Sequence, residues 1–186
     1  PKSIKYQKIN DGISDFSFSY KNNNDWQYSE ELGFPDTAYI IGGGHVGLTV
    51  SQIMNFLGFY VITFDHRPDV FTMKQNIYAH EKIIINYDKA GSKIIEGNKS
   101  YVIIVTPAHF GDKAALASVL GKKLKYIGMM GSKRKIKKIF QELKKEGFSD
   151  ALLKSVHSPV GLEIEAETPN EIAVSIAAEI IKIKNS

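Results

Sequence analysis

Five short apolar runs recur along the chain, and they restrict its fold more than any other feature of the sequence. Nearly every residue in a run is apolar, and helix-length segments separate most of the runs. Strands that are buried on both faces of a parallel sheet have this unbroken apolar pattern. The runs occupy residues 38–42, 60–65, 82–86, 101–106 and 125–131. The sequence therefore predicts an α/β fold with a doubly wound, mostly parallel sheet.

The length of 186 residues suits one well-buried domain and is short for a cofactor domain plus a separate substrate domain. We expect this domain at residues 37–186. Residues 1–36 differ, because the stretch DFSFSY alternates Phe16, Phe18 and Tyr20 with serine before the polar turn KNNND. Such alternation is typical of a half-buried strand. We interpret residues 1–36 as an N-terminal extension that forms an edge strand or a dimer arm.

Composition excludes several classes of function. The chain contains no cysteine, so it supplies no disulfide, thiolate metal ligand or thiol nucleophile. No run is long enough to span a membrane and the first residues lack a signal-peptide core, so we expect a cytoplasmic protein without a membrane partner. Much of the basic excess lies in the helical stretch SKRKIKKIFQELKK, residues 132–145. We interpret these charges as a solvated helix face and expect no nucleic-acid partner.

A glycine-rich stretch, YIIGGGHVGLTV, follows the first apolar run. Its spacing matches G-x-G-x-x-G between a strand and a helix, the arrangement in which a Rossmann-like domain binds a pyrophosphate. In that setting Gly42 makes the tight turn, Gly44 permits close approach of the phosphate, and Gly47 packs helix against sheet. The predicted binding turn comprises Gly42, Gly43, Gly44, His45, Val46 and Gly47. The alternative is a strand-to-helix turn that binds no nucleotide.

An acidic residue follows at the spacing expected for a ribose contact. Asp65 ends the second apolar run about 20 residues after the turn, where an acid binds ribose hydroxyls. His66 and Arg67 come next, and Arg67 would accommodate a 2′-phosphate. NAD and NADP therefore both remain as expected dinucleotides.

Two further motifs follow the fourth and fifth runs, at the edge where doubly wound sheets bind ligands. In TPAHFGD, His109 is a candidate acid, base or donor to a carbonyl, or else an exposed histidine at a helix entry. In GSKRK, Ser132 caps a helix and Lys133, Arg134 and Lys135 follow, which predicts an anion site or a capped surface helix. The candidate binding residues here are Thr106, Pro107, His109, Gly131, Ser132 and Arg134.

The last helix has the clearest start signal in the chain. Thr168 and Glu171 have the spacing of a capping box, and Pro169 occupies the first helical position. The acids that precede it, Glu163, Glu165 and Glu167, alternate along VHSPVGLEIEAETPNE. Alternating acids of this kind are usually solvent-facing, so we predict no metal site.

Four segments together resemble a known family. IGGGHVG, DHRP, MMGSKRK and HSPVGLEIEAETPNEIAVSIAAEII are similar to the C-terminal domain of xanthine dehydrogenase accessory factors, the XdhC and CoxI type, over residues 38–184. The resemblance implies a maturation factor that binds the molybdenum cofactor (molybdopterin) and protects it while a cysteine desulfurase sulfurates it. It implies delivery of the cofactor to a molybdenum hydroxylase client such as xanthine dehydrogenase. It also implies that His157 joins the binding site.

The chain departs from this family in two places. Fuller members carry an N-terminal domain with a Gly-Gly-Cys element that is absent here, and the usual Thr-His-x-His-x-x-Asp reads TPAHFGD, which lacks the first histidine. Either the chain is a short paralogue or a partner chain supplies the missing half; a homodimer is a further expectation. Three functions follow: an accessory chaperone with no catalytic residue of its own, a small NAD(P)-dependent oxidoreductase, or a nucleotide-sensing domain without chemistry.

Overall fold

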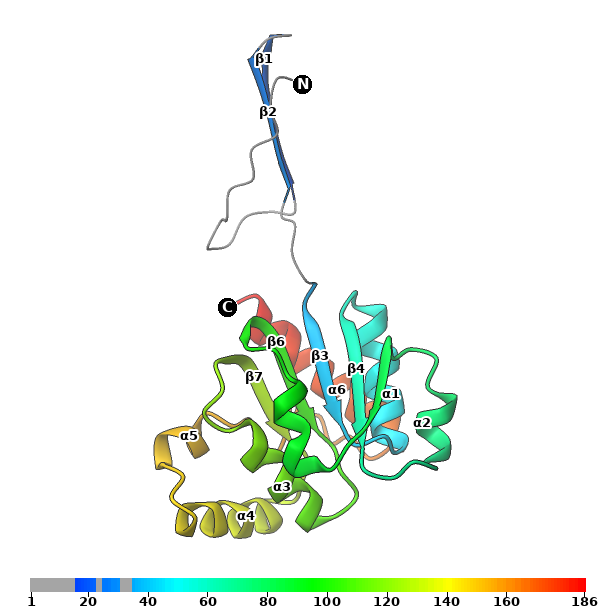
Figure 1. Cartoon of the computed structure of the whole chain (residues 1–186), viewed down its shortest axis with the longest axis vertical. Helices are drawn as coiled ribbons and strands as arrows, with labels where there is room; N and C mark the ends of the chain where they lie inside the picture. Colours follow the sequence, from blue (N-terminus) through cyan, green and yellow to red (C-terminus); the bar gives the residue numbers. More distant parts are fainter. Residues whose placement is uncertain (1–15, 23–24, 31–34) are drawn as a thin grey trace. The chain divides into compact units, whose positions relative to one another are not determined.

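A computed structural model describes residues 16–22, 25–30 and 35–186. The chain divides into two compact units, Pro1–Phe34 and Pro35–Ser186 (Figure 1). In the first unit β1 (Phe16–Asn22) pairs antiparallel with β2 (Asp25–Glu30). The strand predicted from DFSFSY is therefore present, and it belongs to a two-stranded sheet. Part of the predicted polar turn, residues 23–24, lies outside the described residues.

The second unit is built on a five-stranded sheet in the order β5-β4-β3-β6-β7. All four neighbouring pairs of strands are parallel. The strands are β3 (Thr37–Ile41), β4 (Tyr60–Asp65), β5 (Glu81–Ile84), β6 (Gly97–Ile104) and β7 (Leu124–Met129). This arrangement confirms the predicted doubly wound, Rossmann-like sheet.

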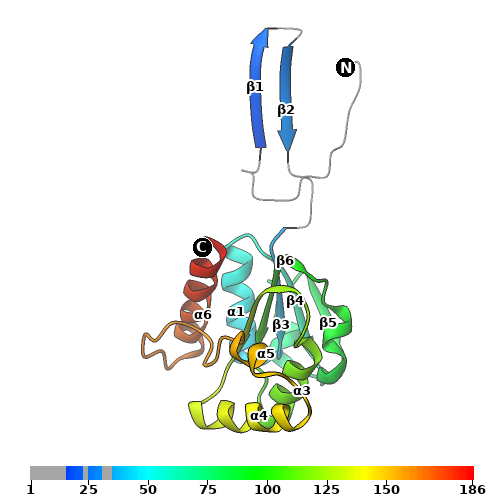
Figure 2. The same ribbon diagram turned by 90° about the vertical axis from the view of Figure 1, so that its left-hand side faces the viewer.

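Helices cover both faces of this sheet, which explains why the strand residues are almost all apolar. Successive residues of β3 enter opposite cores: Ala38 and Ile40 face one layer, and Tyr39 and Ile41 face the other. The first layer contains α1 (His45–Phe56) and α6 (Pro169–Lys184). The second contains the 3₁₀ helix η1 (Tyr87–Lys93), α3 (His109–Val119), α4 (Lys133–Lys145) and α5 (Asp150–Lys154), as Figure 2 shows.

The helix ends follow local sequence signals. Thr168 and Glu171 form the predicted capping box at the start of α6. Gly58 and Gly147 follow α1 and α4 with φ of 82° and 97°, a left-handed conformation that glycine adopts readily. Ile176 and Ile180 on α6 are fully buried, and each contributes roughly 1.5–3 kcal/mol by leaving water. None of the helices in the described ranges is long and apolar enough to cross a membrane.

The strand order reverses between β3 and β6, and this reversal locates the site. Connections from these two neighbouring strands leave toward opposite faces, so a crevice forms at their carboxyl ends. The glycine turn after β3 and the start of α3 after β6 both lie at this edge. Helix α4 runs across the same end of the sheet in both views (Figures 1 and 2).

Candidate functional site

Two glycines of the turn are required by the fold itself. Gly42 has φ of 123°, and a Cβ atom there would lie 2.5 Å from the carbonyl oxygen of Val105. A Cβ on Gly47 would lie 1.9 Å from the carbonyl oxygen of Gly42. No side chain fits at these distances, so both positions hold strand and helix in close contact.

Gly44 differs from these two because nothing in the fold requires it. It is the N-cap of α1 with φ of −75°, and no atom lies within 4 Å of the place where its Cβ would be. Every other glycine of residues 35–186 has either a positive φ or a neighbour within 4 Å. No side chain caps α1, and its first turn contains no acid. The free N–H groups of this helix start therefore face open space.

The Asp65 side chain stabilises the glycine turn by hydrogen bonding. Its side chain is fully buried, and its oxygens accept hydrogen bonds from the Gly43 amide (2.8 Å) and from the backbone and guanidinium of Arg67 (2.9 Å each). Burial raises the pKa of this carboxyl, but the hydrogen bonds from Arg67 and Gly43 outweigh it and lower the pKa to about 2. A ribose contact would require Asp65 to release one of these donors.

A pocket of about 440 Å³ opens beside the turn. One wall is Gly44 and His45, and the other is the loop after β4 together with the start of α2 (Phe71–Gln75). Thr72 on α2 donates a hydrogen bond to the carbonyl oxygen of Gly43. The sequence predicted Arg67 on this side but did not predict residues 68–72 as site residues; of these only Pro68, in DHRP, belongs to a motif. His66 is exposed and lies 3.5 Å from Asp65.

A second group of polar residues lies on the α3 side of the crevice. The backbone nitrogen of Thr106 is 3.0 Å from the position of a Cβ on Gly42, and its hydroxyl donates to the Asp112 carboxylate. Asp112 is fully buried, and Lys135 on α4 forms an ion pair with its other oxygen, Oδ2. That oxygen has no hydrogen bond of good geometry in the described part of the chain. Burial raises the pKa of Asp112, against the opposing effects of Lys135 and Thr106.

The other predicted residues of this side contact α4 or are exposed. His109 lies 3.4 Å from Glu142 on α4, and Pro107 is exposed. Ser132 accepts a hydrogen bond from the Lys135 amide (3.3 Å) and caps α4, as predicted. Arg134 is exposed. Gly131 has the stem of Lys135 3.2 Å from its Cβ position, so its missing side chain makes room for that stem.

His157 is not close to the glycine turn. It pairs with Gly128 beside β7, stacks on Tyr126, and lies 3.4 Å from Glu179 of α6. The segment of His157 is three strand spacings away from β3, a distance of about 14 Å across the sheet. In the described ranges no three histidines or acids come together in a way that would hold a metal ion.

The parallel sheet, its strand order and the glycine turn define a Rossmann-like α/β domain. Residues 38–180 match the family described as the XdhC Rossmann domain. The chain therefore belongs to this family, as the resemblance predicted.

Relatives agree with this assignment and are much longer. Over 150 residues, 79% of this chain, it is 27% identical to the uncharacterized protein YqeB of Escherichia coli K12. Over 145 residues, 78% of this chain, it is 28% identical to a Bacillus subtilis 168 protein described as a probable subunit of xanthine dehydrogenase. The chain spans 27% and 42% of these two proteins.

A solved structure shows the same fold. It is described as a xanthine dehydrogenase from Bacillus halodurans, and it matches 86% of this chain with a TM-score of 0.71 at 28% identity. The matched part is 45% of that protein. The domain described here is thus related to part of a larger protein that is linked by description to xanthine dehydrogenase.

Proposed function

We propose that this chain is an accessory factor for a molybdenum hydroxylase, and that its glycine turn binds the phosphate or pyrophosphate group of the molybdenum cofactor or of a dinucleotide. The family membership and the descriptions of the relatives support the link to xanthine dehydrogenase. The observation that carries the phosphate site is the free space at Gly44. A phosphate there would accept hydrogen bonds from the first amides of α1 and would benefit from the helix dipole.

The residues around the turn fit this ligand chemistry. Gly44 leaves open space at the start of α1, the neighbouring pocket has room for a flat ring system, and Arg67 lines that pocket. The cofactor would supply the molybdenum and its sulfur ligands, and this chain would hold the phosphate end. The hydroxylase client and a cysteine desulfurase are the proposed partners, and a homodimer is a further proposal.

The alternative is a small NAD(P)-dependent oxidoreductase. It would require Asp65 to bind a ribose, whereas phosphate binding at α1 leaves the hydrogen bonds of Asp65 unchanged. A ribose hydroxyl must compete with Arg67 and Gly43 for the same carboxylate oxygens. Phosphate binding at α1 requires no such exchange. This difference favours the accessory role.

A titration of purified protein with NAD, NADP and molybdopterin tests the proposal, with Gly44→Val as the diagnostic variant. The valine side chain enters empty space at an allowed φ and replaces only a glycine N-cap, so the melting temperature should fall by only about 2–4 °C while phosphate-containing ligands lose at least tenfold in affinity. Gln52→Val, on the exposed face of α1, is the matched control for placing a β-branched residue in this helix.

Two results would overturn parts of the proposal. Equal binding by Gly44→Val and wild type would remove the phosphate site from the turn. Turnover of a small substrate with NAD(P), together with no binding of molybdopterin, would replace the accessory role by the oxidoreductase.

A further inference from the structure

A buried charge pair connects three elements at the crevice edge, and the glycine turn does not account for it. Asp112 of α3 is fully buried and binds Thr106, which follows β6, and Lys135 of α4. A buried ion pair rarely adds stability by comparison with apolar residues of the same size. Its presence at a ligand-binding edge therefore invites a functional explanation.

The path of Lys135 brings its ammonium into the site. The residue lies in the first turn of α4, and its stem folds back over Gly131 to reach Asp112. The Thr106 hydroxyl binds Asp112, and the Thr106 nitrogen lies 3.0 Å from the place where a Cβ of Gly42 would be, so Thr106 lies between the ion pair and the glycine turn. The Lys135 side chain is still 25% exposed. Its ammonium has three N–H donors, and the carboxylate does not use all of them.

The other cations at the start of α4 are placed differently. Lys133 pairs with Glu163 at the surface, where both side chains are more than 80% exposed. Arg134 is exposed and makes no ion pair within residues 35–186. Lys135 alone among these three is held at the sheet edge.

We propose that Lys135, rather than Arg134, is the cation that contacts a second anionic group of the ligand, and that Asp112 is a positioning residue that holds the Lys135 ammonium toward the crevice. This inference rests on the proposed function, because it assumes a phosphate-containing ligand at α1. The ligand class is an extended polyanion such as a pyrophosphate ester, with one phosphate on the α1 amides and the next near Lys135. The carboxylate fixes a flexible lysine in advance, so less side-chain entropy is lost on binding.

The first test is calorimetry with inorganic pyrophosphate on the full chain. Lys135→Met should weaken pyrophosphate binding by roughly 10- to 100-fold, since a charge-assisted contact is lost. Arg134→Met should change it less than about twofold, since that side chain faces solvent. Lys137→Met is the matched control, because Lys137 is exposed on the same helix and makes no ion pair in the described region.

A second comparison separates the effect of Lys135→Met on affinity from its effect on stability. Lys135→Met leaves the buried Asp112 charge unpaired and should lower the melting temperature by roughly 10 °C. The double variant Asp112→Asn/Lys135→Met removes both charges and should recover most of that loss. If its pyrophosphate affinity stays as low as that of Lys135→Met, the lost affinity comes from the missing cation.

The positioning role of Asp112 is tested by asking whether its effect on pyrophosphate affinity depends on Lys135. Asp112→Asn should weaken pyrophosphate binding several-fold in the wild-type background and have no further effect when Lys135 is already methionine. A purely structural Asp112 would lower stability in both backgrounds without this dependence of the affinity on Lys135, and that result overturns its positioning role.

The outcomes distinguish the inference from the function on which it rests. If wild type binds neither pyrophosphate nor molybdopterin, the proposed phosphate site fails and this inference fails with it. If wild type binds pyrophosphate, Gly44→Val does not, and Lys135→Met binds as wild type, the phosphate site stands and the assignment of Lys135 is wrong. Loss of binding in Arg134→Met but not in Lys135→Met would transfer the role to Arg134.

Discussion

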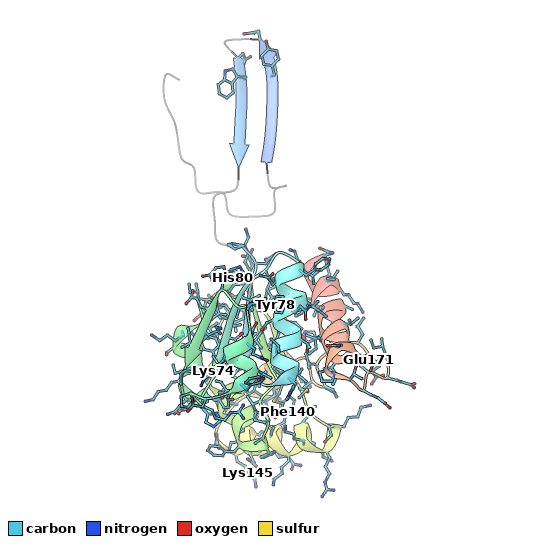
Figure 3. All side chains as sticks on the ribbon, turned by 90° about the vertical axis from the view of Figure 1, so that its right-hand side faces the viewer. Lys74, Tyr78, His80, Phe140, Lys145 and Glu171 are labelled. Carbon is cyan, nitrogen blue, oxygen red and sulfur yellow. The ribbon has the colours of Figure 1, made fainter. Side chains whose placement is uncertain are left out.

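Helices α1 and α6 lie side by side on one face of the sheet and begin in opposite ways (Figure 3, in which Glu171 is labelled near the start of α6). Thr168 accepts a hydrogen bond from the Glu171 amide, and the Glu171 carboxylate accepts from the amides of Thr168 and Glu167. At α1, glycine occupies the same position and no side chain binds the amides. The hydroxyl of Thr49 on α1 donates to the carbonyl of Pro169, so these ends are neighbours.

Under the proposed function, this difference separates helix starts that are capped within the fold from one that is left open for a ligand. Ser132, Ser149 and Thr168 cap α4, α5 and α6 with their own side chains. Helices α1, α2 and α3 have no side-chain cap, and of these three α1 is the one that begins in the glycine turn. Four substitutions test the comparison, and their expected effects on stability decrease in the order given.

Gly47→Ala should have the largest effect, because its methyl group would overlap the carbonyl of Gly42. We expect a loss of about 3 kcal/mol or more in the free energy of unfolding, measured by urea denaturation. Gly44→Ala introduces the same methyl group three residues earlier and should cost only about 0.5–1 kcal/mol, the effect of losing a glycine N-cap. Similar stability of the two variants would contradict the division of the turn into packed and open glycines.

Asp65→Asn should lower stability by about 2 kcal/mol at neutral pH, because the carboxylate binds Arg67 and Gly43. The folded pKa of about 2 is below the ordinary value of 3.8. Stability from Asp65 is therefore complete above about pH 5 and is lost as pH falls through 4 toward 2. Denaturation curves of both proteins between pH 7 and pH 2.5 should converge, and a constant difference would show that the charge of Asp65 is unimportant.

Thr168→Ala should cost about 1 kcal/mol, the usual effect of losing a threonine N-cap. Ligand affinity should not change, since this helix start already satisfies its own amides. Asn170→Ala, an exposed change in the first turn of the same helix, is the control. A tenfold loss of pyrophosphate affinity in Thr168→Ala would mean that α6 contributes to the site.

Gly44→Ser gives α1 the cap that α6 has, and its effect on stability should be the smallest. We expect a gain of a few tenths of a kcal/mol, because serine caps only slightly better than glycine. The new hydroxyl would bind the amides that the ligand needs, so affinity for pyrophosphate should fall. Tighter binding would show that the free amides are not the anion site.

The sheet was largely predictable because strands buried on two faces leave a continuous apolar signal. The predicted run 60–65 matches β4 to the residue. β6 begins at Gly97, four residues before its predicted start, because its first residues are polar and carry no such signal. Helix α4 and the capped start of α6 also followed from spacing. α2 and η1 are too short to leave a clear helical period.

The site was less predictable because it depends on which way side chains turn. The glycine pattern identified the turn, but it could not show that Asp65 points inward to Gly43. In the GSKRK motif, the sequence could not show that Lys135 folds over Gly131 to reach Asp112. His157 is far from the turn because its segment adds to the outer side of β7.

Helix α6 also affects the order in which the molecule can be assembled. It completes the layer that covers Ala38, Ile40 and Ile103, yet it is made of residues 169–184, which are synthesised after every strand of the sheet. During translation α1 can cover part of this apolar face, but the part that α6 covers stays exposed until the ribosome has released the segment. A nascent chain stalled before residue 169 should bind chaperones that recognise exposed apolar surface, and release of α6 should end that binding.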